Sequence, residues 1–528
     1  MMNETERRAT IARGRAVLGI EFGSTRIKLC LTAAEQSVVL ATGIHEWRSS
    51  LVGGFWTYSL EQIHDGLQAA YRDLSRNVVS QYGVAVADLA AVGVSAMMHG
   101  YLAFDAEGAL LTPYRTWRNT NTAQAAALLS AELEMNIPMR WSVAHLHQAI
   151  LDREEHVSRI SSLTTLSGFV HRLLTGQNVV GIGDASGMFP VGTAAWDEDL
   201  LDRYDAMSAL QVPIRELLPR VQCAGTSAGE LTAEGAQLLD PTGALRSGAV
   251  FCPPEGDAGT GMVATRAVVP RTGNVSVGTS IFAMVVLEQP LTGTNPEVDL
   301  VATPDGTPVA MIHCNNGADE LAGWARVFGQ FADAHGANND PDEVFATLFR
   351  EALKGEADAG GIVSYNQLAG EPVVSLDQGR PMVVRTPTGQ LTLANLMRAH
   401  LLGTFAALSI GMKLLTDEGV RLDRIAGHGG VFRTEGVAQR LLAAALGVEV
   451  AVSSTASEGG AWGMAELASF TLDRAEVSLA EFLERRAVGV EKSDVTAPDA
   501  ADSAGFTTFL ERYVDGLEAV RVAGARIG

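Results

Sequence analysis

The sequence predicts an α/β chain that contains two similar units. Apolar, strand-like segments alternate with helix-like segments in both halves of the 528 residues, a length that suits two or three domains. Two hairpin-like stretches also match each other, because Phe22-Gly23-Ser24-Thr25 corresponds to Val277-Gly278-Thr279-Ser280. Such self-similarity indicates a duplicated domain. Two unrelated tight turns would explain these residues equally well, so the rest of the chain must decide.

The first half supplies the elements of the first unit in order. Residues 17–23 and 27–32 are predicted strands around the first turn. Residues 59–83 have helical spacing, with Ser59 as N-cap and Gly83 as stop. Residues 89–98 are predicted to return as a buried strand, and a helix over 164–176 ends at Gly176. The first domain is therefore expected to span residues 15–262.

The second half repeats this alternation. Residues 274–277 and 281–287 are predicted strands around the second turn. The elements expected after them are a helix at 391–419, a strand at 424–430, a helix at 434–447, a strand at 448–454 and a helix at 458–472. Residues 486–505 are polar and are expected to form a loop before a last helix at 506–524. The second domain is expected at 263–485, and a C-terminal loop and helix at 486–528.

Composition narrows the function. The formal net charge is −22, from 39 basic and 61 acidic side chains, so binding to nucleic acid or to an anionic membrane is not expected. The four cysteines show no CxxC spacing, which indicates reduced thiols in a cytoplasmic protein. The N-terminus is polar and unlike a secretory signal, and no uncharged apolar run approaches a membrane span. A small-molecule partner is expected.

The two turns have the composition of phosphate sites. Glycine lets the backbone approach an anion closely, and successive N–H groups and hydroxyls can surround a phosphate. Gly23-Ser24-Thr25 and Gly278-Thr279-Ser280 both combine these features. If two equivalent domains face each other, both turns would meet at one cleft.

Seven short motifs follow one another over residues 15–485: "GIEFGSTRIK", "SAMMHGYLAFD", "TPYRTWRNTNT", "GDASG", "PPEGDAGTGM", "VSVGTS" and "GHGGVFRTEGVAQRLLAAALGVEV". In this order they resemble the FGGY carbohydrate kinases, within the actin-like (ribonuclease H-like) ATPase superfamily, and their xylulokinase-like branch in particular. The family's corresponding segments are, in turn, the first phosphate motif, two sugar segments, an interior loop, the catalytic segment, the second phosphate motif and the adenosine motif. The resemblance implies two duplicated actin-like domains facing a central cleft.

The resemblance also implies the nucleotide-side residues, with ATP and Mg²⁺ as cofactors. Glu21 stands where the family has an Asp that holds the metal through water, and Val431 stands where it has a third glycine. Lys28 is equally well explained as a solvated strand residue. The residues implied in nucleotide binding are Gly23, Ser24, Thr25, Lys28, Gly278, Thr279, Ser280, Gly429 and Gly430.

On the sugar side, Asp257 is implied as the general base that accepts the proton of the attacking hydroxyl. Glu255 is the alternative base, and a helix-capping Asp257 is the alternative role. Asn119 replaces an Asp of the family, and Ala258 replaces an Asn. The residues implied in substrate binding are Met98, His99, Trp117, Asn119, Asp257 and Ala258.

The function implied is ATP-dependent phosphorylation of a small sugar, with a ketopentose such as xylulose as the first expectation. Another ketose or a polyol such as erythritol is the alternative, because the departures from the family cluster on the substrate side. An actin-fold ATPase or sugar-binding protein without kinase activity, and a homodimeric state, also stay open. A dehydrogenase is disfavoured, because no GxGxxG links a strand to a helix.

Overall fold

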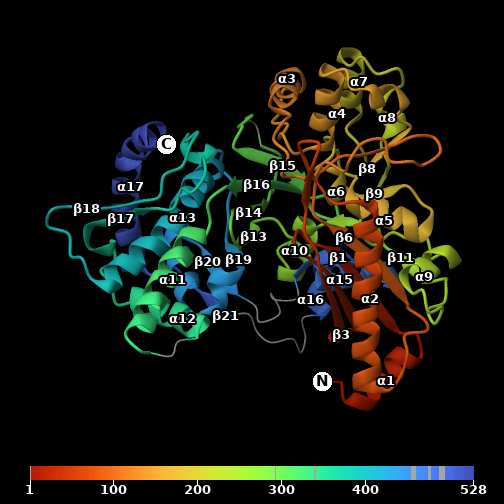
Figure 1. Cartoon of the computed structure of the whole chain (residues 1–528), viewed down its shortest axis with the longest axis horizontal. Helices are drawn as coiled ribbons and strands as arrows, with labels where there is room; N and C mark the ends of the chain where they lie inside the picture. Colours follow the sequence, from red (N-terminus) through yellow and green to blue (C-terminus); the bar gives the residue numbers. More distant parts are fainter. Residues whose placement is uncertain are drawn as a thin grey trace. The chain divides into compact units, whose positions relative to one another are not determined.

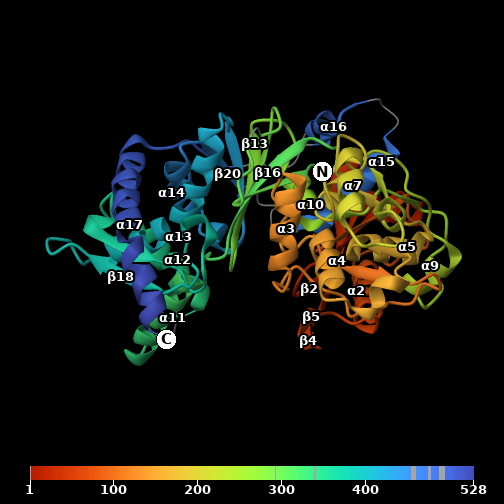
Figure 2. The same cartoon turned by 90° about the horizontal axis from the view of Figure 1, so that it is seen from above.

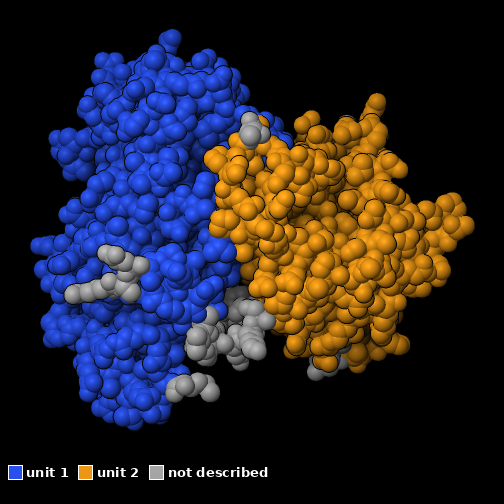
Figure 3. Space-filling view, turned by 180° about the vertical axis from the view of Figure 1, so that it is seen from behind, with its two compact units in different colours: residues 1–269, 294–309, 458–490 blue, residues 270–293, 310–457, 491–528 orange. Residues whose placement is uncertain are grey.

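The structure is a computed structural model that describes residues 2–291, 293–337, 340–452, 459–473, 477–486 and 494–527. The chain forms two compact units that interleave along the sequence (Figure 3). Unit 1 contains residues 1–269, 294–309 and 458–490, and unit 2 contains residues 270–293, 310–457 and 491–528. The first crossing, at residue 269, lies close to the boundary expected at 262. Residues 458–490 belong to unit 1, whereas the division into consecutive domains placed 458–485 in the second domain.

Unit 1 is built on a six-stranded mixed sheet in the order β11-β6-β1-β2-β3, with β12 also pairing with β6 (Figure 1). Strand β1 is antiparallel to β2 and parallel to β6, so the predicted hairpin forms the centre of the sheet. The strands of unit 1 are β1 (Ala16–Phe22), β2 (Arg26–Ala33), β3 (Gln36–Glu46), β4 (Ser50–Val52), β5 (Phe55–Thr57), β6 (Ala91–Ala96), β7 (Leu102–Phe104), β8 (Ser162–Thr164), β9 (Val179–Gly181), β10 (Arg220–Gln222), β11 (Val250–Phe251), β12 (Glu255–Gly256) and β15 (Val298–Ala302).

Helices α2 (Leu60–Tyr82) and α15 (Gly459–Leu472) cover opposite faces of this sheet. Side chains alternate between the two faces of a strand. In β2, Ile27 and Leu29 belong to the core beside α2, whereas Cys30 packs with Trp462 of α15. Both faces are buried, which explains why β1 and β2 read as nearly continuous apolar runs.

The helix ends of unit 1 follow the signals in the sequence. Ser59 caps α2 in a capping box with Gln62, and Gly83 ends the helix in the left-handed conformation. Gly176 ends α5 in the same way. The other helices of unit 1 are α1 (Glu4–Ala12), α3 (Ala123–Leu133), α4 (Ser142–Leu151), α5 (Leu166–Thr175), α6 (Ile182–Ala185), α7 (Glu198–Met207), α8 (Ile214–Leu217), α9 (Ala233–Leu239), α10 (Asp257–Thr265) and α16 (Leu479–Arg486).

Unit 2 repeats the pattern of unit 1, with β16, β14, β13, β19, β20 and β21 as successive neighbours in one sheet. Figure 2 labels β13, β16 and β20 of this sheet. Strand β13 is antiparallel to β14 and parallel to β19, as β1 is to β2 and β6. This equivalence confirms the α/β fold with a duplicated unit. The strands are β13 (Thr272–Val277), β14 (Ile281–Val286), β16 (Pro308–Cys314), β17 (Ile362–Tyr365), β18 (Met382–Arg385), β19 (Arg424–His428), β20 (Glu449–Val452) and β21 (Asp494–Thr496).

The long helix α13 forms the core of unit 2. Among the described helices it is the one whose length and apolar composition would suffice to cross a membrane, but 72% of that apolar window is buried, as in the core helix of a folded domain. The helices of unit 2 are α11 (Asp319–Ala334), α12 (Pro341–Ala352), α13 (Leu393–Asp417), α14 (Val437–Leu446) and α17 (Ala500–Arg526).

The loop predicted over residues 486–505 was wrong in part. Strand β21 lies within it and pairs with β20 as an antiparallel edge strand. Helix α17 then begins at Ala500, where Asp499 accepts hydrogen bonds from two backbone N–H groups. Edge strands tolerate polar residues, and Asp is a preferred N-cap, so polar composition alone misled the prediction. Residues 487–493 of that prediction lie outside the described residues.

Candidate active site

The first turn is held by its carbonyl groups. The Trp47 indole Nε1–H donates to the carbonyl of Gly23 at 2.7 Å, and the Tyr58 hydroxyl donates to that of Ser24 at 2.6 Å. The backbone N–H of Trp47 donates to the carbonyl of Thr25 at 3.1 Å. In a trans peptide the N–H points opposite to the C=O. The N–H groups of Ser24 and Thr25 therefore point away from the body of unit 1, beside two exposed side chains.

Glu21 lies at the end of β1, beside the start of α15. Its Oε2 is buried and has no hydrogen-bond partner among the residues that the structure describes, with the Lys28 Nζ 3.9 Å away in the facing register position. Burial raises the pKa of Glu21, Lys28 lowers it, Asp257 raises it and a hydrogen bond from the Ala461 backbone lowers it. A Cβ on Gly460 would stand 2.6 Å from Oε1. The structure therefore brings Glu21 close to Asp257 and leaves one carboxylate oxygen without a hydrogen bond.

Asp257 is the first residue of α10, which begins directly after β12. Its Oδ1 accepts the backbone N–H of Met98 at 3.1 Å, so the catalytic segment touches the sugar segment. Burial raises the pKa of the Asp257 carboxyl, while hydrogen bonds from the backbone of Met98, Ala258 and Asp257 lower it. The carboxyl is only partly shielded from solvent, unlike that of Glu255. A partly accessible carboxylate with a raised pKa suits proton transfer.

Glu255 is 1% exposed and turns into the protein. Its oxygens accept the backbone N–H groups of Gly183 and Asp184, at 3.3 and 2.9 Å. Burial raises its pKa, and the nearby Asp184 raises it further. Asp184 accepts hydroxyl hydrogen bonds from Thr165, at 2.6 Å, and from Ser167. Both carboxylates accept backbone N–H groups, but Glu255 is fully buried whereas Asp257 is half-buried.

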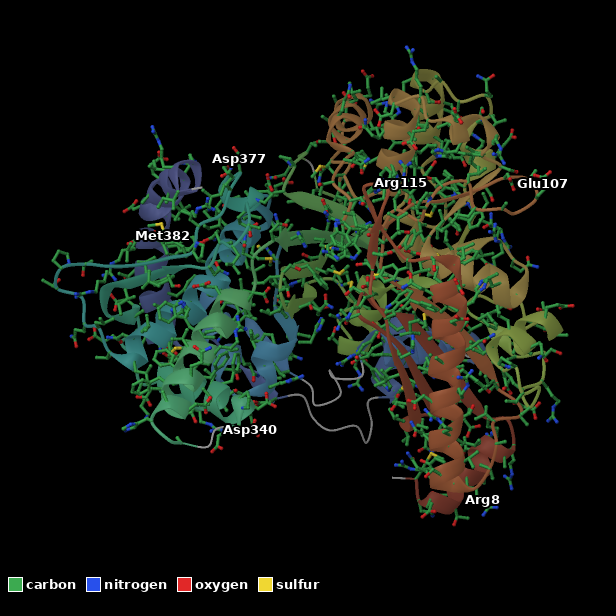
Figure 4. The ribbon with its side chains drawn as sticks, in the orientation of Figure 1. Arg8, Glu107, Arg115, Asp340, Asp377 and Met382 are labelled. Atoms are coloured by element: carbon green, nitrogen blue, oxygen red, sulfur yellow. The ribbon has the colours of Figure 1, made fainter. Side chains whose placement is uncertain are left out.

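The buried Asp184 carboxyl should make the stability of the protein depend on pH. Burial raises its pKa from 3.8 to about 7. The stability that comes from its protonated form is present below about pH 4 and is lost as pH rises to about 7. Asp184→Asn should therefore flatten the fall of stability over this window, by up to about 1.4 kcal/mol per pH unit. Melting temperature against pH measures this, with the exposed Glu107→Gln as control (Figure 4). A wild-type profile in Asp184→Asn would contradict the shift.

His99 is 5% exposed and has a left-handed backbone, with φ 71°. The Arg140 Nε donates to its Nε2 at 3.1 Å, so its Nδ1 carries the proton and donates to the carbonyl of Gly187 at 3.3 Å. Arg140 in turn forms an ion pair with Asp299. The imidazole is thus fixed in one tautomer, and Arg140 stands beside it as a residue that the sequence did not point to.

Trp117 and Asn119 take different positions. Trp117 is 39% exposed, as an aromatic wall for a sugar would be. Asn119 is 4% exposed, and its amide pairs with the backbone of Trp56: Oδ1 accepts the N–H at 2.8 Å, and Nδ2 donates to the C=O at 3.0 Å. Nδ2 also donates to the carbonyl of Thr116 at 3.0 Å. Asn119 therefore joins its segment to β5, which gives its side chain a structural role.

The segment is anchored to β5 a second time. Arg115 is fully buried inside unit 1 (Figure 4), pairs with Glu154, and places its guanidinium 4.2 Å from the centroid of the Phe55 ring. Ala258, predicted to bind substrate, is 8% exposed beside Asp257.

Asn119→Asp, which restores the acid of the family, is expected to destabilise the protein by about 1–3 kcal/mol. The carboxylate would lose both donated hydrogen bonds and would face two carbonyl oxygens. Chemical denaturation measures the loss, with the exposed Asn121→Asp as matched control. A stable Asn119→Asp variant with a lower KM for sugar would instead make position 119 a sugar ligand.

The carbonyl groups of the second turn, in unit 2, also accept hydrogen bonds, in this case from backbone N–H groups. The N–H of Ala318 donates to the carbonyl of Gly278 at 2.8 Å, and the N–H of Gly317 donates to that of Thr279 at 2.7 Å. A Cβ on Gly317 would overlap the Gly278 oxygen. The N–H groups of Thr279 and Ser280 therefore point away from this loop. In both turns, therefore, the carbonyl groups accept hydrogen bonds from their own unit.

The adenosine motif meets the second turn. Gly429 has φ 114°, and a Cβ there would overlap the carbonyl of Val277, the residue before the turn. Gly430 is exposed with open space around it, whereas Val431 is 1% exposed and lies in the core. Gly429 is therefore required by the close approach of two backbones. The sequence-predicted glycines of unit 2 lie together.

No group of three or more His, Cys, Asp or Glu side chains that could hold a metal ion occurs in the described part of the chain. Mg²⁺ commonly takes one or two carboxylates, with phosphate and water as its other ligands. The unpartnered Oε2 of Glu21 fits such a site.

Comparison with known proteins gives family matches over most of the chain. The sequence profile of the FGGY family of carbohydrate kinases, N-terminal domain, matches residues 16–243, and that of the C-terminal domain matches residues 273–472. A xylulose kinase of Haemophilus influenzae is 21% identical over 95% of this chain and 99% of its own length. A xylulose kinase of Streptomyces coelicolor is 26% identical, over 41% of this chain and 44% of that protein.

Solved structures show the same fold. A xylulose kinase from Lactobacillus acidophilus has a TM-score of 0.79 at 18% identity, covering 97% of this chain and 100% of its own. A gluconate kinase from the same organism has the same TM-score and identity, covering 97% and 99%. A glycerol kinase from Plasmodium falciparum, solved with ADP, has a TM-score of 0.73 at 13% identity, covering 95% and 97%. These neighbours share the fold of this chain over almost its whole length.

Proposed function

The chain belongs to the FGGY family of carbohydrate kinases, and we propose that its substrate is a small ketose, with a ketopentose such as xylulose first. It is an ATP-dependent carbohydrate kinase. The observation that carries the site is the hydrogen bond between Asp257 and the Met98 backbone, which joins the catalytic segment to the sugar segment.

The proposed reaction is a direct transfer. A sugar hydroxyl oxygen forms a bond to the γ-phosphorus of ATP, the bond from that phosphorus to the bridging oxygen of ADP breaks, and the hydroxyl proton passes to the Asp257 carboxylate. Burial raises the pKa of Asp257, which makes the carboxylate a stronger base than an exposed aspartate. Because the acid form cannot accept the proton, turnover should fall as pH drops through this raised pKa.

The nucleotide is proposed to bind through the phosphate turns. In each turn anchored carbonyls orient N–H groups outward, which supports contacts from Ser24, Thr25, Thr279 and Ser280 to phosphate oxygens. Glu21 would hold Mg²⁺ through water, and the bound ion would neutralise charge on the phosphates.

The substrate class draws on three supports. Two curated relatives are named xylulose kinase. The exposed ring of Trp117 is suited to cover a sugar face, and His99 and Arg140 supply a fixed polar group next to Met98. Another ketose, or a polyol such as erythritol, is the second candidate, because Asn119 and Ala258 depart from the family on this side.

The protein is proposed to act in the cytoplasm, because its four cysteines show no CxxC spacing and are expected to be reduced.

A substrate panel tests this proposal. Purified protein is incubated with ATP, Mg²⁺ and single ketopentoses, hexuloses, aldoses and polyols, and each product is weighed by mass spectrometry. The proposal expects D-xylulose or another ketopentose to gain one phosphoryl group at the highest kcat/KM. A hexulose or polyol that exceeds every ketopentose by tenfold or more would overturn the ketopentose assignment.

A further inference from the structure

In the first turn, three successive carbonyl groups, those of Gly23, Ser24 and Thr25, accept hydrogen bonds from two aromatic residues. No sequence motif indicates these contacts. Trp47 holds two of them, through its indole and its backbone N–H, and Tyr58 holds the third. Both aromatic side chains are buried, at 5% and 2% exposure, and their rings stack with centroids 4.0 Å apart. Phe22, the last residue of β1, packs edge-on against Trp47 at 5.6 Å.

The proton of Tyr58 is directed toward the turn. The hydroxyl carries one proton, and it donates that proton to the carbonyl of Ser24, 2.6 Å away. Burial raises the pKa of Tyr58, while Ser49 and the charge of Arg118 lower it. Arg118 lies close by, because its Nη1 donates to the Ser49 Oγ at 3.0 Å.

From this arrangement we propose that Trp47 and Tyr58 are positioning residues for the nucleotide phosphates. They act through the Gly23-Ser24-Thr25 backbone, because fixing the carbonyls inward fixes the N–H groups outward. This inference rests on the proposed function of the turn as a phosphate site. The second turn supports it, since Gly317 and Ala318 hold the carbonyls of Gly278 and Thr279 from behind in the same manner.

The two units use different hydrogen-bond donors to hold the carbonyl groups of their turns. In unit 2 the donors are backbone N–H groups, and the Asn366 side-chain amide fixes their loop by donating to the carbonyls of Asn316 and Gly317. In unit 1 the donors to Gly23 and Ser24 are side chains. Removing one donor there frees a peptide group to rotate, whereas the ring packing of the aromatic pair is kept.

The test is Tyr58→Phe, which deletes one hydroxyl. A hydrogen bond of this kind is worth about 0.5–1.5 kcal/mol, so the Kd for ADP and the KM for ATP should rise by about 2–13-fold. The KM for sugar should stay within twofold. Tyr82→Phe is the matched control, because Tyr82 is also buried and donates to a backbone carbonyl, that of Leu40, at 2.7 Å. It should leave nucleotide affinity unchanged.

Isothermal titration with Mg²⁺ and ADP reads the result without any sugar. Unchanged ADP affinity in Tyr58→Phe, or an equal loss in Tyr82→Phe, would overturn the inference while leaving the kinase proposal intact. If no sugar is phosphorylated by the wild type, the proposed function fails, yet the titration still decides the positioning role. Should Tyr58→Phe not fold, Trp47→Phe removes the Nε1 donor to Gly23 and is expected to give the same selective loss of ADP affinity.

Discussion

Asp257→Asn is expected to lower sugar phosphorylation by about 10²–10⁴-fold while ADP still binds. The amide keeps an oxygen that can accept the backbone N–H of Met98, so the local structure should survive. It cannot accept the proton of the attacking hydroxyl. Steady-state turnover and ADP titration on the same preparation measure the two effects.

Glu255→Gln is the comparison for Asp257→Asn, because Glu255 is the other carboxylate of this loop. Its oxygens already accept the N–H groups of Gly183 and Asp184, so this change should alter stability more than turnover. The assignment would be reversed if Glu255→Gln abolished turnover in a folded protein and Asp257→Asn left turnover near the wild-type value.

Glu21→Gln should lower turnover by about 10²–10³-fold and shift the Mg²⁺ dependence of activity to higher concentration. One oxygen of the carboxylate is buried and has no hydrogen-bond partner in the described part of the chain. Glutamine has nearly the same shape as glutamate but no charge. Binding of sugar should change little. The measurement is a Mg²⁺ titration of activity, made beside a melting curve of the same sample.

A structural role for Glu21 predicts something different. If Glu21 only pairs with Lys28, this partly exposed ion pair should contribute between the ~0.2–1 kcal/mol of an exposed pair and the ~3–5 kcal/mol of a buried one, and Lys28→Met should lower the melting temperature as Glu21→Gln does. A much lower melting temperature for Glu21→Gln with an unshifted Mg²⁺ curve would remove the metal role.

Most of the fold followed from local signals in the sequence. The hairpins at β1–β2 and β13–β14 and the helix ends at Ser59, Gly83 and Gly176 were predictable, because alternating apolar runs, caps and left-handed glycines act over a few residues. The return of α15 to unit 1 was not predictable in this way. It depends on contacts between residues far apart in the chain, such as Gly460 beside Glu21.

The residues of the candidate site also differ in how far they could be predicted from local sequence. The motifs predict Asp257 as the base and the glycines of both turns as phosphate contacts, and these roles stay predictions. The sugar-binding role of Asn119 also stays a prediction, and the sequence did not indicate that its amide pairs with the backbone of Trp56. Trp47 and Tyr58 carry no motif, because their role arises from hydrogen bonds across 24 and 34 residues of sequence. Such partners become visible only in three dimensions.

The most direct test of the account follows the γ-phosphoryl group itself. ATP radiolabelled at that group is incubated with the protein and D-xylulose, and with the protein alone, and the products are separated by chromatography. Label is expected in a sugar phosphate when the ketose is present, with little release of label without it. Label released as inorganic phosphate at the same rate with and without every sugar of the panel would contradict it.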